Sequence, residues 1–158
     1  SKGSLLNFCI GQGEILVTPI QVFNYTNLLA TKGNANSPHL VTSIKKEPKS
    51  EILLAPQIWD RIIFDMGQVV SHAKGTGKNA DPAIQGVEIY GKTGTAENPH
   101  GEDHAWFIGW AQYKERKFSI VVLLENSGSG GAVAAPLAKN VFDKIILGID
   151  NSKQISMK

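Results

Sequence analysis

The strongest constraint on the fold comes from two apolar segments that are joined by a short charged connection. "HAWFIGWAQY" (residues 104–113) and "KFSIVVLLEN" (residues 117–126) are apolar on both faces, and "KERK" (residues 114–117) lies between them. Such strands are normally covered by helices on both sides, and a connection this short favours a hairpin turn. The preceding segment, residues 86–96, alternates apolar and polar residues, which predicts a third strand. We therefore expect an antiparallel sheet buried between helices.

Three amphipathic segments are predicted to supply those helices. Thr18 can cap a first helix over residues 19–33, a second begins at Pro56, and a third covers residues 133–148. A glycine is expected to end the first and the third of them. Apolar residues recur at helical spacing in each: Val22, Tyr25 and Leu29; then Trp59, Ile63, Met66 and Val70; then Val133, Leu137, Val141 and Ile145.

The order of these elements indicates an α+β fold. "HLVTSIKKE" (residues 39–47) has strand character, so the expected order is helix, short strand, helix, three strands, helix. This order predicts an antiparallel sheet with helices on both faces. The chain of 158 residues fits one domain or part of a larger one. Apolar residues begin at Leu5 without an initiator Met, so we expect a piece of a longer chain.

Composition argues against several classes of protein. A net charge of +2 is too small for a nucleic-acid or polybasic membrane surface. No run approaches the roughly 20 apolar residues of a transmembrane helix. The single cysteine, Cys9, rules out an intrachain disulfide, and its apolar neighbours predict a buried, unreactive thiol.

The tripeptide Lys92-Thr93-Gly94, in the third-strand segment, is the candidate site. Lys92 can attract a carboxylate or move a proton, and Thr93 can hydrogen-bond the same carboxylate. Gly94 has no side chain, so a substrate backbone can lie close to it. A peptide could also add to this strand as an extra strand. On the tripeptide alone, an ordinary strand end is the alternative.

Three longer segments together resemble class B penicillin-binding proteins, and most nearly their elongation-type branch, penicillin-binding protein 2. They are "GQGEILVTPIQVFNYTNLLATKGNANSPHLV", "GVEIYGKTGTAENPHGEDHAWFIGWA" and "FSIVVLLENSGSGGAVAAPLAKNVFDKIIL". The resemblance runs from about Leu5 to Leu147. It implies the penicillin-binding transpeptidase (serine β-lactamase-like) fold. It also assigns residues 1–158 to the C-terminal part of one transpeptidase domain, with the nucleophilic serine in the absent N-terminal part.

The resemblance also implies a chemistry for the tripeptide. The parent protein would cross-link peptidoglycan through a serine acyl-enzyme, and β-lactams would trap that serine. Lys92 would sustain a positive field and a proton relay, and Thr93, next to Gly94, would bind the carboxylate of substrate or drug. The Thr95 backbone N–H would supply one oxyanion-hole donor.

No metal and no organic cofactor are implied. The implied partners are peptidoglycan stem peptides, β-lactam antibiotics and membrane proteins of cell elongation, with no nucleic acid. The implied location is the periplasmic face of the inner membrane, with an anchoring N-terminal helix that is absent from this chain.

The companion motifs of these enzymes are Ser-x-x-Lys and Ser-x-Asn. Ser43–Lys46 and Ser71–Lys74 match the first by letters. Ser43 lies in strand-like sequence and Ser71 where a helix ends, whereas the nucleophile should open a buried helix beside its lysine. No Ser-x-Asn occurs. We therefore expect the 158 residues alone to be inactive.

Two further features are expected to carry no cofactor chemistry. The loop "ENPHGEDH" (residues 97–104) holds four possible metal ligands, but they are crowded into one turn. A polar, mobile surface loop at the mouth of the substrate groove is the favoured interpretation. The glycines at 128, 130 and 131 lack the Lys-Ser/Thr that follows a phosphate-binding loop.

Two alternative functions stay open at this stage. One is a D,D-carboxypeptidase or a β-lactam sensor of the same clan, in which water, or nothing, resolves the acyl-enzyme. The other is a non-catalytic interaction module that binds a cell-elongation partner through its sheet and terminal helix. The sequence that precedes Ser1 would test both, because an extended pedestal domain before Ser-x-x-Lys favours the transpeptidase and a full-length chain without the serine favours the interaction module.

Overall fold

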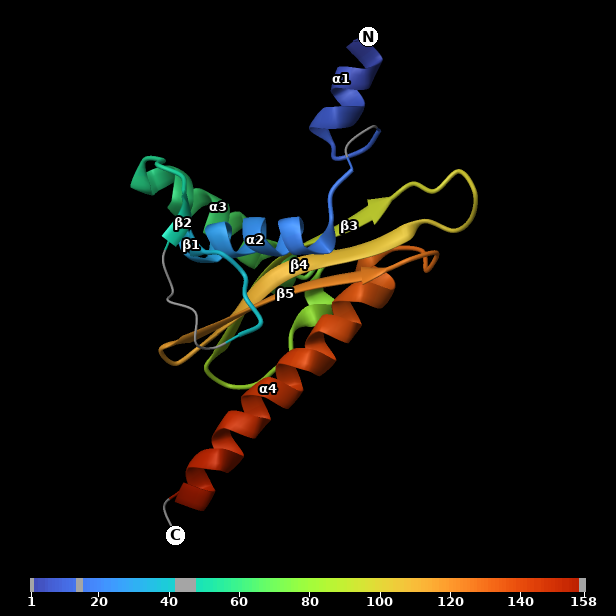
Figure 1. The fold of residues 1–158 in the computed structure, drawn as a ribbon. Coiled ribbons are helices and arrows are strands. Elements are labelled where there is room, and N and C mark those ends of the chain that lie inside the picture. The colour runs from blue at the N-terminus through green and yellow to red at the C-terminus, as the bar shows by residue number, and fades with distance from the viewer. Residues whose placement is uncertain (1, 14–15, 42–47, 157–158) are drawn as a thin grey trace.

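The computed structural model describes residues 2–13, 16–41 and 48–156 (Figure 1). Its larger sheet has three antiparallel strands in the order β3 (Val87–Ala96), β4 (His104–Tyr113) and β5 (Arg116–Leu124). Tyr113 pairs with Arg116, so the β4–β5 turn has two residues. The three predicted strands and their hairpin are thereby confirmed.

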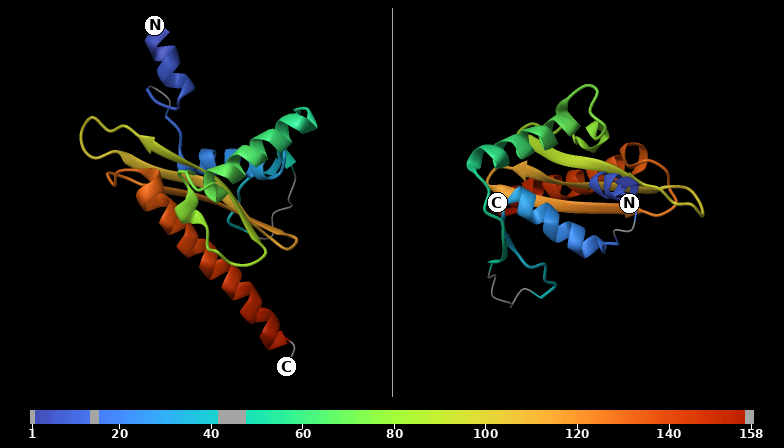
Figure 2. Two further views of the ribbon diagram at one scale, coloured as in Figure 1. Left: turned by 180° about the vertical axis from the view of Figure 1, so that it is seen from behind. Right: turned by 90° about the horizontal axis from the view of Figure 1, so that it is seen from above.

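Helices cover both faces of this sheet (Figures 1 and 2). The described helices are α1 (Lys2–Cys9), α2 (Pro19–Ala30), α3 (Pro56–Ser71) and α4 (Ala135–Ser156). A short 3₁₀ helix, η1 (Lys78–Ala80), precedes β3, and a π-helical segment, η2 (Gly130–Ala134), leads into α4. The two faces carry separate cores, one against α4 and one against α2 and most of α3, whose Val70 belongs to the α4 core. This arrangement confirms the expected α+β class.

Alternation along β4 assigns its side chains to the two cores. Phe107 is fully buried and packs with Phe142 and Ile146 of α4. Trp110 points to the opposite face, where it packs with Leu29 and Trp59. Each face of the sheet is thus closed by aromatic and aliphatic side chains from helices distant in sequence.

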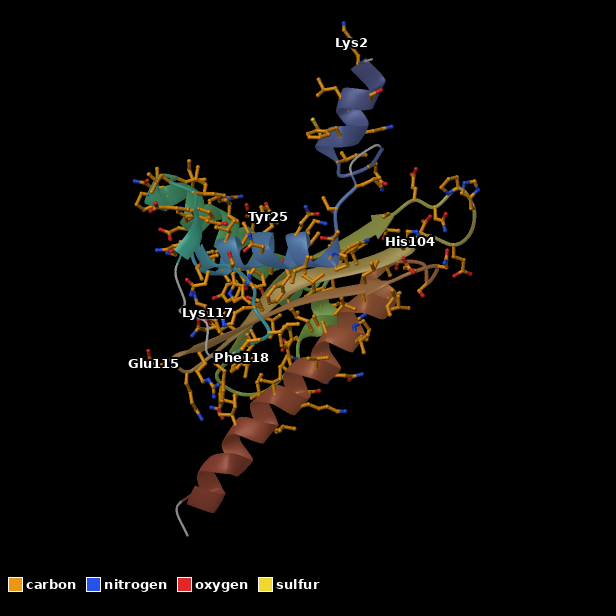
Figure 3. The ribbon with its side chains drawn as sticks, viewed as in Figure 1. Lys2, Tyr25, His104, Glu115, Lys117 and Phe118 are labelled. Atoms are coloured by element: carbon orange, nitrogen blue, oxygen red, sulfur yellow. The ribbon has the colours of Figure 1, made fainter. Side chains whose placement is uncertain are left out.

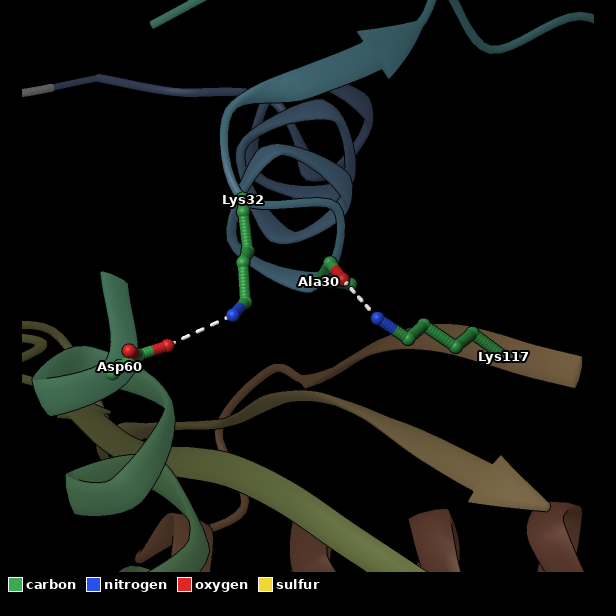
Figure 4. Close-up of polar contacts among 4 residues, drawn as sticks. All are labelled: Ala30, Lys32, Asp60 and Lys117. Atoms are coloured by element: carbon green, nitrogen blue, oxygen red, sulfur yellow. Dashed lines mark hydrogen bonds and ion pairs between the residues drawn. The ribbon is translucent and has the colours of Figure 1, made fainter. Parts of the chain in front are cut away.

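Two lysines tie the end of α2 to its neighbours (Figure 4). Lys32 Nζ forms an ion pair of 2.8 Å with Asp60 of α3. Lys117 Nζ donates a hydrogen bond of 2.7 Å to the carbonyl oxygen of Ala30. Burial, and then the charge of Lys32, lowers the pKa of Lys117. The bond from Lys117 supplies a partner for the Ala30 carbonyl, which lies at the end of α2 and has no partner within the helix. Lys117 lies beside the β4–β5 turn, at the far end of the sheet from His104 (Figure 3).

The predicted apolar stripe of the last helix is wrong by one position. The buried residues are Ala134, Ala135, Ala138, Phe142 and Ile146. Leu137 and Val141, which the pattern assigned to the core, are 40% and 37% exposed. The cause is the alanines, because small side chains let the helix approach the sheet closely while adding little to an apolar pattern. The predicted end at Gly148 is also wrong, since α4 continues to Ser156.

The helix predicted to come first is α2, which follows a helix that was not predicted, α1. Its position is confirmed, and its buried face needs one correction. Thr18 caps α2 through a capping box with Gln21, and the positive φ of Gly33 lets its N–H close the helix end on the Leu28 carbonyl. Tyr25, however, is 52% exposed, and Thr26 is buried instead. The Thr26 hydroxyl donates to a carbonyl one turn back at 2.8 Å, so this residue presents mainly its methyl group to the core.

Two other expectations need correction. Residues 39–41 form no strand, and residues 42–47 lie outside the described part of the chain. A small sheet forms instead from β1 (Asn34–Asn36) and β2 (Pro48–Glu51). Cys9 is exposed rather than buried, because it lies on α1, where no described residue is buried. Over the described ranges, no helix has the length and apolar character needed to span a membrane.

Candidate active site

The Lys-Thr-Gly tripeptide lies on β3, which is an edge strand of the three-stranded sheet. β3 pairs with β4 along its whole length, and its other edge carries no strand within the described residues. Thr93 and Thr95 project to the α4 side of the sheet, since they pair with Phe107 and Ala105 of that core. The pleat places Lys92 on the opposite side. The strand thus presents a cation and two hydroxyls around one edge.

Thr93 is a buried polar residue whose hydroxyl has a specific partner. Its side chain is 8% exposed, and its Oγ1 lies 2.7 Å from Oγ1 of Thr76. When Thr76 donates in this pair, Thr93 keeps its own proton for an acceptor such as a carboxylate. The exposed Lys92 extends its ammonium along the strand, where it donates to the carbonyl oxygen of Thr93.

Thr95 and Gly94 are held against the start of η2. The N–H of Gly130 donates to Oγ1 of Thr95 at 3.4 Å. A Cβ added to Gly130 would lie only 2.2 Å from the carbonyl oxygen of Trp106 and 2.4 Å from that of Gly94. A π-helical segment is uncommon and occurs frequently at functional sites. Here it brings backbone directly onto the strand that carries the tripeptide.

Three residues that contribute to this region, Thr76, Asn79 and Gln12, could not be identified from the sequence. Thr76 orients Thr93 from a loop seventeen positions earlier. The carbonyl of Gly131 accepts from Asn79 at 3.1 Å, and a Cβ on Gly131 would lie 2.6 Å from the Thr76 carbonyl oxygen. Gln12 reaches the outer edge of β3 from eighty-three positions away. No local periodicity connects these segments, and the only local signal that could have pointed to close packing is the pair of glycines at 130 and 131.

Tyr90 lies on β3, on the α2 side of the sheet. Its ring stacks on Trp110 with 5.1 Å between centroids, and its hydroxyl donates to Glu88 at 3.0 Å. Burial, and then the hydrogen bond and charge of Glu88, raises the pKa of the Tyr90 phenol above its ordinary value of 10.0. The neutral phenol is therefore part of the folded state.

This shift predicts a late phenol titration. The ultraviolet difference between wild type and Tyr90→Phe should titrate with a midpoint above 10.0. Glu88→Gln should lower that midpoint without returning it to the ordinary value, because burial is the larger cause. Since the folded-state pKa is raised, the stabilising contribution of Tyr90 is complete below pH 10 and declines as the pH rises past it. A Tyr90 midpoint at or below 10 would contradict the packing described.

The loop over residues 97–104 is tied to the segment between β5 and η2. Asn98 Nδ2 donates to Asn126 Oδ1 at 2.6 Å, and the Asn126 N–H donates to His104 Nδ1 at 3.0 Å. The N–H groups of Ser127 and Gly128 both donate to the Asp103 carbonyl. His100 and Glu102 point to solvent. Among the described residues, no group of three or more His, Cys, Asp or Glu side chains is arranged to hold a metal.

The two serines that match Ser-x-x-Lys by letters are not placed as nucleophiles. Ser71 is the last residue of α3 and is exposed, so it closes a helix rather than opening one. Ser43 lies outside the described residues. A cavity of about 1080 Å³ lies between α2 and the β1 region. Neither the tripeptide nor Thr95 lines it, so the candidate site is the β3 edge rather than this hollow.

Comparison with known proteins identifies the family. The penicillin-binding protein transpeptidase domain matches residues 1–143. The chain belongs to this family. It is 36% identical to the peptidoglycan D,D-transpeptidase MrdA of Haemophilus influenzae, a match that covers 90% of this chain and 26% of that protein. The chain thus spans about a quarter of the length of this relative, and the fold expected from the resemblance is confirmed.

Solved structures of the family have the same architecture. Penicillin-binding protein 2 of Pseudomonas aeruginosa, in complex with WCK 5153, is 37% identical with a TM-score of 0.77, and the match covers 90% of this chain and 32% of that one. Penicillin-binding protein A of M. tuberculosis, an imipenem acyl-enzyme complex, is 31% identical with a TM-score of 0.66 over 87% and 32%. A complex of penicillin-binding protein 2 with MreC from Helicobacter pylori is 29% identical with a TM-score of 0.71 over 90% and 28%.

Proposed function

We propose that this chain supplies the substrate-binding strand of a peptidoglycan D,D-transpeptidase. The observation that carries the proposal is the placement of Lys92, Thr93 and Gly94 on a strand at the edge of the described sheet, in a member of the transpeptidase family. A cation, a hydroxyl held in place by Thr76, and backbone donors all lie along one edge. This combination suits a ligand that has a carboxylate next to a reacting carbonyl.

Each residue has a role in the proposed reaction. A serine elsewhere in the complete protein attacks the carbonyl of the penultimate D-Ala of a stem peptide. The terminal D-Ala leaves with a proton, an acyl-enzyme forms, and an amine of a neighbouring stem resolves it. Thr93 binds the terminal carboxylate, and Lys92 provides the positive field and proton relay. The Thr95 N–H stabilises the developing oxyanion together with the N–H of the serine.

The proposed partners follow from this chemistry and from the relatives. Peptidoglycan stem peptides are the substrates, and β-lactams acylate the same serine, as in the imipenem acyl-enzyme of the M. tuberculosis relative. Membrane proteins of cell elongation are proposed partners, since a relative forms a complex with MreC. The place of action would be the periplasmic face of the inner membrane.

Labelling with a fluorescent penicillin tests the proposal. The full-length protein is expected to form a covalent adduct, whose serine should map by mass spectrometry to a position before Ser1 of this chain. The isolated 158 residues are expected to form none, because a nucleophile must lie beside its base. A stable adduct on Ser43 or Ser71, or no adduct on the full-length protein, would refute it.

A further inference from the structure

The side-chain amide of Gln12 hydrogen-bonds the outer edge of β3 through both its nitrogen and its oxygen. Its Nε2 donates to the carbonyl oxygen of Thr95 at 2.9 Å. The N–H of Glu97 donates to its Oε1 at 3.3 Å. One side-chain amide therefore takes an acceptor from Thr95, near the end of β3, and a donor from Glu97, just beyond the strand.

The surrounding turn fixes Gln12 in this position. Gly11 and Gly13, on either side of it, have φ values of +77° and +90°, which residues with a side chain rarely adopt. The N–H of Gly11 donates to the Phe8 carbonyl and that of Gln12 to the Asn7 carbonyl, at the end of α1. The Gly-Gln-Gly segment is thus a helix-ending turn that projects one amide toward β3.

Strand geometry shows what this amide replaces. The N–H and C=O of one strand residue point to the same side, so both groups of Thr95 point outward from the sheet. A residue paired with Thr95 in an antiparallel arrangement would exchange two hydrogen bonds with it. Its carbonyl would accept from the Thr95 N–H, and its own N–H would donate to the Thr95 carbonyl. Gln12 already occupies the second of these positions.

We propose that Gln12 is a place-holder at the β3 edge, whose amide competes with the acyl donor for the Thr95 carbonyl. The Gln12 amide is hydrogen-bonded to the Thr95 carbonyl while no substrate is bound. When an acyl donor binds, the secondary amide N–H of its reacting residue displaces Gln12 from that carbonyl. Between substrates the amide also shields an open edge from pairing with another strand. This inference rests on the proposed function, since it takes the β3 edge as the place where the acyl donor pairs.

The inference predicts opposite responses to two matched ligands. Gln12→Ala in the full-length protein should raise the second-order rate of acylation by an ordinary penicillin, because its amide N–H no longer competes with Gln12. One neutral hydrogen bond corresponds to roughly twofold to tenfold in that rate. The rate for a penicillin methylated on the same amide nitrogen should not change, because it has no proton to donate. Gln12→Glu should resemble Gln12→Ala, since a carboxylate cannot donate to Thr95.

The controls separate this inference from the proposed function. Gln85→Ala, in the exposed loop before β3, should alter neither rate. An unchanged or slower rate with the ordinary penicillin, or equal acceleration with both ligands, would refute the place-holder role while the proposed function stands. If neither ligand acylates the wild-type protein, the proposed function fails and takes this inference with it.

Discussion

Thr93→Val is expected to slow acylation of the full-length protein by a penicillin on the order of a hundredfold. That is the usual effect of removing one donor to a developing or fixed anion in an enclosed site. Valine has nearly the same shape as threonine, so the change removes the hydroxyl while retaining the packing. The stability cost should be only about 1 kcal/mol, from the lost hydrogen bond to Thr76. Acylation is measured by stopped-flow fluorescence, and stability by thermal unfolding.

Thr76→Val is the matched control for this prediction. It removes the same hydrogen bond from the other side, so the Thr93 hydroxyl loses its partner but is still present as a donor. Its effect on stability should be similar, while its effect on acylation should be much smaller. A penicillin with an esterified carboxylate gives a second control, because the loss caused by Thr93→Val should nearly vanish with it. If Thr93→Val combined with Lys92→Ala left the penicillin rate unchanged, the tripeptide would be an ordinary strand end.

Gly130→Ala is expected to destabilise the protein by about 3 kcal/mol, the upper part of the range for forcing a methyl group into packed structure. The added Cβ would lie 2.2 Å and 2.4 Å from backbone oxygens of Trp106 and Gly94. These atoms cannot rotate away as a side chain would, so β3 and η2 must separate. Acylation should fall as well, because the displaced strand carries Thr95.

Gly148→Ala is the matched substitution, and we expect it to stabilise the protein where Gly130→Ala destabilises it. Gly148 lies inside α4, and nothing lies within 4 Å of an added Cβ. Alanine should therefore stabilise the helix by up to about 1 kcal/mol. Urea unfolding of the two variants beside wild type measures both effects. A Gly130→Ala variant as stable as wild type would show that η2 does not pack on β3 as described.

Much of the sheet could be predicted from the sequence because its signals are local. The period of two in residues 86–96 and the apolar runs on either side of "KERK" each indicated a strand without any knowledge of distant residues. The same local pattern predicted that Lys92 and Thr93 lie on a strand. It also showed Ser71 at a helix end rather than at a helix start.

The rest depended on packing that no local pattern contains. Ala134 at the end of η2 and Ala138 of α4 are buried against the sheet because this segment lies close to it. A pattern based on hydrophobicity instead predicts that the larger Leu137 and Val141 are the buried residues. Gly148 was expected to end that helix, but glycine does so only where it adopts a left-handed conformation, and Gly148 does not. Thr76 and Gln12 reach β3 through tertiary contacts, so their roles became visible only in three dimensions.

The bond between Lys117 and Ala30 joins residues that are 87 positions apart. The strands, by contrast, pair only with their neighbours along the chain, β3 with β4 and β4 with β5. Bringing distant segments together costs more chain entropy than closing a hairpin, and topologies rich in distant pairs fold more slowly. The three-stranded sheet can thus assemble from two successive hairpins, whereas α2 must wait for a formed surface on which to dock. We therefore expect α2 to dock late in folding, although it precedes the three strands along the chain.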